Sequence, residues 1–268
     1  MSHLKCYIQI IYSTMKLQMK QSFARPMFRF CLICNPVVNT IFLYEMFMQK
    51  GTEAFLNHVV LGAGLMGIWG CICFSSVGDI NRERWSQTLP ILYVAPGGFG
   101  LIIFGKVLGN TLLSMVTFVL SYITSGILSG KYFTVVHGGW FLLSMFLTIT
   151  CFIVVSLCFS YIMMLSRKTE LYMNLIEIPL VFICGFTFPV EVLPMWAQGI
   201  SNLLAPTWAV RLLRISAGTI IGASMDIGLY IQNAGILLGE MMFLVLLTHG
   251  LYRWMDKRVR IFATLEVS

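Results

Sequence analysis

Long apolar stretches without charge, separated by short clusters of charged residues, constrain the fold of this chain more than any other feature. A bilayer core of about 30 Å requires about 20 apolar residues for each helix that crosses it. Only helices and closed barrels satisfy their backbone groups in lipid, and these stretches lack the alternation of barrel strands. We therefore predict an all-α membrane protein with six transmembrane helices, at about residues 27–48, 55–77, 101–128, 139–165, 171–188 and 227–252.

The charged residues indicate how the chain lies in the membrane. Only 11% of the 268 residues are charged, about half of what a soluble domain carries. The net charge of +7 comes from Lys and Arg at the ends of apolar runs, which argues against a nucleic-acid partner. Fourteen of the 18 Lys and Arg fall on one side of the predicted bilayer. We expect that side, with both termini, to be cytoplasmic in a bacterial-type cell membrane.

The first 26 residues are predicted to form a separate amphipathic helix ahead of a six-span domain over residues 27–268. Leu4, Tyr7, Ile8 and Ile11 recur at helical spacing, while the lysines fall on other faces. Basic residues opposite an apolar stripe are typical of a helix that lies in the cytoplasmic interface of a membrane. The pair at residues 25–26, Arg followed by Pro, should end this helix.

A polar loop is expected at residues 78–100, on the cytoplasmic side. It mixes charges of both signs with Trp85 and Leu89. An ordinary solvated loop is one interpretation. The alternative is a short amphipathic helix that offers its charges to a soluble partner.

Prolines and aromatic residues interrupt the chain between the last two predicted spans. Pro189 and Pro194 should end the fifth span, Trp196 lies on a short apolar face, and Pro206 breaks the helix again. Broken helices at membrane depth must satisfy their backbone groups within protein. We expect lids or re-entrant extracellular helices in this segment, which also contains Arg211.

Two signals for cofactor binding are weak. Residues 100–106 match the pattern G-x-x-x-x-G-K, but Val107 stands where a phosphate-binding loop needs Ser or Thr. The histidines are scattered singly, and most cysteines lie inside apolar runs as small hydrophobic residues. We expect this chain to bind neither ATP nor a metal ion itself.

Polar residues inside the predicted spans are candidates for a transport pathway. Asn35 and Asn39 are four apart and share a helix face that should avoid lipid. Glu177 and Glu240 lie mid-span, where a carboxylate is costly unless it is paired or protonated. Hydrogen bonding between packed helices is the alternative for both. Together with Phe186, the two asparagines and Glu177 form our candidate pathway set.

Four features of the chain resemble ABC-2 type permeases, the membrane subunits of ATP-binding-cassette exporters. They are the six-span layout, the N-terminal amphipathic helix, the loop Asn-Arg-Glu-Arg-Trp-Ser-Gln-Thr-Leu, and the stretch Phe-Pro-x-x-x-Leu-Pro-x-Trp…Ala-Pro-Thr…Arg. The loop departs from the family pattern at Asn81, Ser86 and Pro90. The resemblance implies that residues 79–89 form a coupling helix against an ATPase subunit, with contacts from Asp79, Arg82, Glu83, Arg84 and Trp85.

The resemblance also implies a function. Two permease subunits would pair, each with one ATPase subunit that holds ATP and Mg²⁺, and this chain would have no catalysis of its own. The cargo would be hydrophobic or amphipathic: a drug, a peptide antibiotic, a lipid or a lipid-linked sugar. A membrane-embedded enzyme and a secondary transporter are the alternatives. The first would need clustered catalytic residues and the second an internal repeat.

Overall fold

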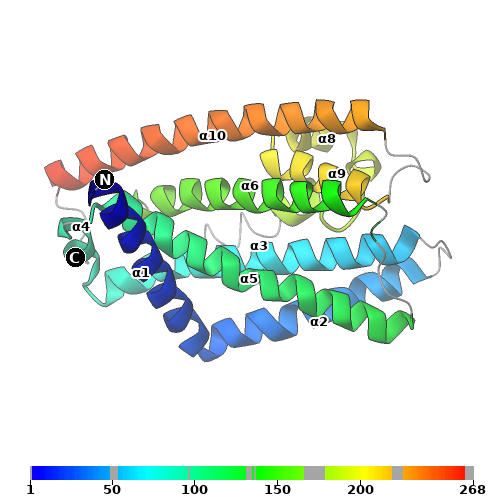
Figure 1. Ribbon diagram of the computed structural model, residues 1–268, viewed down its shortest axis with the longest axis horizontal. Helices are drawn as coiled ribbons and strands as arrows, with labels where there is room; N and C mark the ends of the chain where they lie inside the picture. The colour runs from blue at the N-terminus through cyan, green and yellow to red at the C-terminus, as the bar shows by residue number, and fades with distance from the viewer. Residues whose placement is uncertain are drawn as a thin grey trace.

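The computed structural model describes residues 2–48, 54–95, 97–130, 135, 137–165, 179–218 and 226–262, and this part of the chain forms helices without a single strand. Figure 1 shows long helices side by side, with shorter ones at both ends. Their bounds are α1 Ser2–Ala24, α2 Pro26–Met48, α3 Ala54–Trp85, α4 Leu89–Val94, α5 Phe99–Ser129, α6 Gly138–Leu165, η1 Val190–Val192 (a 3₁₀ helix), α8 Met195–Asn202, α9 Ala205–Ser216 and α10 Ile227–Phe262.

Five helices of the described residues are long and apolar enough to cross a membrane. They are α2, α3, α5, α6 and α10, which coincide with five of the six predicted spans. The first eight residues of the predicted fifth span, 171–178, lie outside the described part of the chain, and of the other ten only residues 179–183 are helical before the chain turns. The start of α1 and the end of α10 lie at the same end of the bundle (Figure 1).

Helix α3 is the centre of the bundle. In the most apolar stretch of α3, 93% of the residues are buried. In the most apolar stretches of α2 and α10, only 22% and 17% of the residues are buried. Helix α3 packs against α2, α5, α6 and α9. Trp69 of α3 contacts the rings of Phe152, Phe159 and Phe186, and this aromatic cluster anchors the main core. Such ring pairs add about 0.5–1.5 kcal/mol beyond their area burial.

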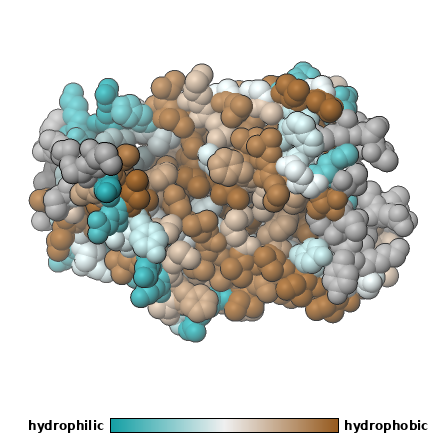
Figure 2. All heavy atoms as spheres, in the orientation of Figure 1, coloured by the Kyte–Doolittle hydropathy of each residue, from teal (hydrophilic) through white to brown (hydrophobic). Residues whose placement is uncertain are grey.

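The outer surface is apolar where lipid would touch it. Ile33 and Phe42 of α2 and Met242 and Phe243 of α10 are exposed. Figure 2 shows apolar side chains over the middle of the visible face, with hydrophilic ones gathered toward its ends. A soluble monomer rarely exposes apolar patches of this extent, so the distribution supports membrane residence.

Glycines bring α1 directly against α5. A Cβ at Gly105 would lie 3.0 Å from the backbone oxygen of Ile11, and one at Gly109 would lie 2.8 Å from that of Met15. Two helix backbones approach this closely only where side chains are missing. The pair therefore serves packing within one subunit and fixes α1 on the bundle.

Candidate functional site

The end of α3 corrects one expectation drawn from the sequence. Residues 79–85 were expected in a loop or in a short separate helix, but α3 continues without a break to Trp85. Asp79 and Glu83 are 3% and 8% exposed, so they face inward. The spacing of four residues places both carboxylates on one side of the helix. Charges that looked solvated in the sequence are buried because α1 and α5 supply partners for them.

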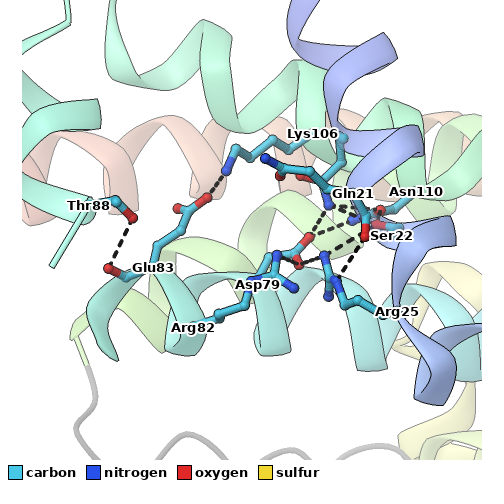
Figure 3. Close-up of polar contacts among 10 residues, drawn as sticks. Gln21, Ser22, Arg25, Asp79, Arg82, Glu83, Thr88, Lys106 and Asn110 are labelled. Atoms are coloured by element: carbon cyan, nitrogen blue, oxygen red, sulfur yellow. Dashed lines mark hydrogen bonds and ion pairs between the residues drawn. The ribbon is translucent and has the colours of Figure 1, made fainter. Parts of the chain in front are cut away.

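Asp79 is the hub of a buried polar network (Figure 3). Its carboxylate accepts hydrogen bonds from Arg25, from Arg82 at 2.9 Å and from the amide of Asn110 at 3.0 Å. Gln18 donates to the same carboxylate. Three helices, α1, α3 and α5, thus meet at one acidic side chain. A buried charge is tolerated when it is paired and hydrogen-bonded in this way.

A second ion pair joins α3 to α5 directly. Lys106 contacts Glu83, and their side chains are 12% and 10% exposed (Figure 3). Removing one partner of such a buried pair typically costs about 3–5 kcal/mol, because the other charge is left uncompensated. The C-terminal end of α3 is therefore rigidly attached to its neighbours.

An exposed turn follows the network. Trp85 is 74% exposed, and residues 86–88 are exposed as well. Gln87 adopts a left-handed backbone with φ 53°, and the amide of Thr88 donates to the carbonyl of Glu83. The turn reverses the chain so that Leu89, at the start of α4, is fully buried. We call residues 85–88 the α3–α4 turn.

Helix α4 connects this turn to the last helix. Its buried Leu89 packs in a cluster with Phe99 and Met255. Tyr93 donates a hydrogen bond to Asp256 near the end of α10. Arg84, at the end of α3, donates to the carbonyl of Met164 in α6. The α3–α4 turn is thereby braced by α6 and α10 in addition to α1 and α5.

The five residues predicted to couple the chain to a partner thus differ in their exposure to solvent. Asp79 and Glu83 are buried, Arg82 and Arg84 are half-buried and hydrogen-bonded within the chain, and only Trp85 is fully exposed. Sequence reasoning missed the partners of the two carboxylates. A usable signal existed, because polar residues within apolar or amphipathic helices need partners. The partners of the two carboxylates are Gln18, Arg25, Lys106 and Asn110, and Ser22 bonds Asn110 beside them.

The opposite end of the molecule carries the proline-rich segment. Pro189 precedes η1, Pro194 precedes α8, and Pro206 lies in the first turn of α9. Proline suits these positions because its fixed φ fits a helix start and its missing N–H is not needed there. Trp196 is 71% exposed on α8. Helices α8 and α9 lie together at the end of the bundle away from α4 (Figure 1).

Charged residues at this end are tied to the scaffold. Arg211 lies over the ring of Trp208, 4.8 Å from its centroid, and pairs with Glu191 at 3.6 Å. The Trp208 indole donates to Glu240 of α10 at 3.1 Å. The carboxylate predicted mid-span in α10 therefore hydrogen-bonds to another helix.

The candidate pathway residues do not form one described cluster. The Asn39 amide donates to Asn35 at 3.2 Å, and both side chains are half-buried in α2. Phe186 is fully buried in the aromatic core beside Trp69. Glu177 lies outside the described residues. No group of three metal-ligating side chains is found in the part of the chain that the structure describes.

These features define a class: a multi-pass helical membrane protein that presents, at one end of its helix bundle, an exposed turn held by a buried ionic network. The family model of the ABC-2 type transporter matches residues 9–217, from α1 through α9, and the chain belongs to this family. The family forms the membrane part of ABC transporters rather than the ATPase, and it associates with ABC ATPases. A search of curated proteins found no match.

Proposed function

We propose that the chain is the permease subunit of an ABC exporter and that the α3–α4 turn receives the force of ATP hydrolysis on a separate subunit. The observation that carries this proposal is the exposed Trp85 directly beside the buried Asp79 network. An exposed aromatic residue is a typical anchor for a protein partner. A partner that moves the turn would move α1 and α5 with it, because the network joins all three helices.

The remaining contacts support the same mechanism. Tyr93 and Arg84 extend the connection from the turn to α10 and α6. Rigid helices that repack between two arrangements convert a small movement at one end into a larger one elsewhere. Tilting of these helices would open a path toward the other side of the membrane, where α8 and α9 lie. We propose that hydrolysis-driven closure of two ATPase subunits produces this movement in a pair of permeases.

The same proposal assigns the two ends of the helix bundle to the two sides of the membrane. The α3–α4 turn, the start of α1 and the end of α10 lie at one end of the bundle, which carries most of the basic residues (Figure 1). That end would face the cytoplasm. Helix α6 ends with Leu165 toward this end and α8 begins with Met195 at the opposite one (Figure 1), which supports a sixth crossing. Helices α8 and α9 would then be the re-entrant extracellular pieces.

Cargo class and direction are inferred from the composition of the spans. The described spans carry few fixed charges, and their outer faces are apolar. A hydrophobic or amphipathic molecule moved outward fits such a protein better than a small ion, which needs coordinating polar groups. Drugs, peptide antibiotics, lipids and lipid-linked sugars belong to this class.

The test uses two exposed tryptophans at opposite ends. The chain is purified with a candidate ABC ATPase, and the amount of ATPase retained and the rate of ATP hydrolysis in proteoliposomes are measured. Trp85→Ala should reduce both without changing the melting temperature of the permease. Trp196→Ala, a control with 71% exposure against 74%, should leave both unchanged. Equal behaviour of the two variants would contradict the assignment of the turn.

A further inference from the structure

A cavity lies beside the Asp79 network, bounded by α1, α3, α4 and α5. Its volume is about 690 Å³, within the range of about 300–1,000 Å³ that small-molecule sites occupy. Arg25, Arg82, Lys106 and Glu83 line it, and apolar residues complete its wall. Figure 3 shows these side chains converging from three helices on one region.

The charges around the cavity do not balance. Arg25, Arg82 and Lys106 contribute three positive charges, while Asp79 and Glu83 contribute two negative ones. Each of the three cations contacts a carboxylate, yet the five side chains together carry one excess positive charge. A half-buried excess charge is unfavourable without a counter-ion. The cavity is therefore suited to a ligand that carries a single negative charge.

An unsatisfied acceptor in the cavity wall specifies a second property of the ligand. Gln18 is 1% exposed and lines the cavity, and its amide nitrogen donates to Ser22, Asp79 and Asn110. Its Oε1 has no hydrogen-bond partner within the described residues. Flipping the amide would place this oxygen against the carboxylate of Asp79, so the orientation is fixed. A ligand hydroxyl that reaches this atom would satisfy it.

The apolar residues of the cavity wall include two at its exposed rim. Leu17 of α1 and Ile91 of α4 both line the cavity and are 56% and 72% exposed. An apolar rim of this kind would not stabilise a bound inorganic anion. It would contact the glycerol backbone and the upper acyl chain of a lipid whose headgroup enters the cavity.

We propose that this cavity binds the headgroup of an anionic phospholipid through its phosphodiester and a headgroup hydroxyl. The phosphodiester would lie among Arg25, Arg82 and Lys106, and a headgroup hydroxyl would donate to Gln18. The lipid tails would leave over Leu17 and Ile91. The proposal is independent of the ATPase, because it needs only the permease chain and its cavity.

The test measures phospholipid retention on the full chain. The purified chain in detergent is titrated with phosphatidylglycerol or phosphatidylcholine, and bound lipid is counted by native mass spectrometry. Phosphatidylglycerol should be retained more strongly, because it has the net charge and hydroxyl groups that phosphatidylcholine lacks. Arg82→Gln should weaken its binding about tenfold, the usual effect of losing one charge-assisted hydrogen bond. Equal retention of the two lipids by the unaltered chain would overturn the proposal.

Two further variants distinguish lipid binding in the cavity from a general effect of the charge of the protein. Arg84→Gln removes the same charge two positions away, where the side chain bonds Met164 instead of lining the cavity, and should leave lipid binding unchanged. Ile91→Glu adds a negative charge at the exposed rim without touching the network, and should weaken phosphatidylglycerol binding. Equal losses in Arg82→Gln and Arg84→Gln, or no loss in Ile91→Glu, would overturn the proposal.

A competition experiment identifies the source of the phosphodiester. Glycerophosphoglycerol, the soluble headgroup, is added in excess to the chain loaded with phosphatidylglycerol. Retention of the lipid would assign the site to the membrane, as the apolar rim indicates. Displacement of the lipid would overturn the role of the rim and assign the site to a soluble phosphodiester.

Discussion

Replacing either partner of the Glu83–Lys106 pair should destabilise the protein far more than replacing both. The two side chains are 10% and 12% exposed and join α3 to α5. Glu83→Met leaves the ammonium group largely buried without its carboxylate, and Lys106→Met leaves the carboxylate without its cation. Each single exchange should lower the free energy of unfolding by about 3–5 kcal/mol.

Replacing both residues of the pair together should not destabilise the protein. With methionine at both positions no charge is left unpaired, and the desolvation cost of the ion pair disappears. The double variant should lie within about 1 kcal/mol of the unaltered protein or exceed it in stability. The six tryptophans allow unfolding by dodecyl sulfate in mixed micelles to be followed by fluorescence.

A matched surface pair provides the control for this cycle. Glu191 is exposed and pairs with Arg211 at 3.6 Å. Exchanging it for glutamine should cost below about 1 kcal/mol, as for other exposed ion pairs. If Glu83→Met and Lys106→Met cost no more than this control, the buried pair does not hold α3 against α5, and the rigid connection of the turn fails.

Three further exchanges test other contacts. Gly109→Ala should destabilise by about 1–3 kcal/mol in the same unfolding assay, because its Cβ meets the backbone of α1, whereas Gly239→Ala on the open face of α10 should be neutral or slightly stabilising. Trp208→Phe should lower the free energy of unfolding by about 1–3 kcal/mol, because its indole N–H is shared between Glu240 of α10 and the carbonyl of Asn202, while Trp196→Phe should have no effect. Tyr93→Phe removes the bond from α4 to α10 and should reduce transport per ATP hydrolysed in proteoliposomes without lowering ATPase retention; unchanged transport would remove α10 from the coupling route.

The apolar runs predicted the spans well because hydrophobic length is a local property. The ends of α2, α5 and α6 lie within a few residues of the predicted limits. The same reasoning failed at the end of α3. A run of charges after residue 77 looks solvated when read alone. Its burial depends on Arg25 and Lys106, which lie far away in the sequence.

This difference changes how the coupling segment must be probed. A charge reversal such as Glu83→Lys would be the natural probe of a solvated coupling loop. In the structure Glu83 is buried against Lys106, so a second lysine there would place two cations together inside the protein. Exchanges at the exposed Trp85 and Ser86 avoid this problem. The prolines predicted breaks in the helices here, and the structure has Pro194 directly before α8 and Pro206 in the first turn of α9, because proline acts through its own backbone.

Accessibility of a cysteine at position 86 tests the central claim most directly. A membrane-impermeant thiol reagent is applied to intact cells and to inside-out vesicles that contain Ser86→Cys, and labelled peptides are identified by mass. The exposed native Cys6 in α1 serves as a control for the same side, and Met195→Cys, at a residue 91% exposed, for the opposite side. We predict that position 86 reacts only in inside-out vesicles and that the bound ATPase subunit protects it. Labelling of position 86 from outside intact cells would contradict the account.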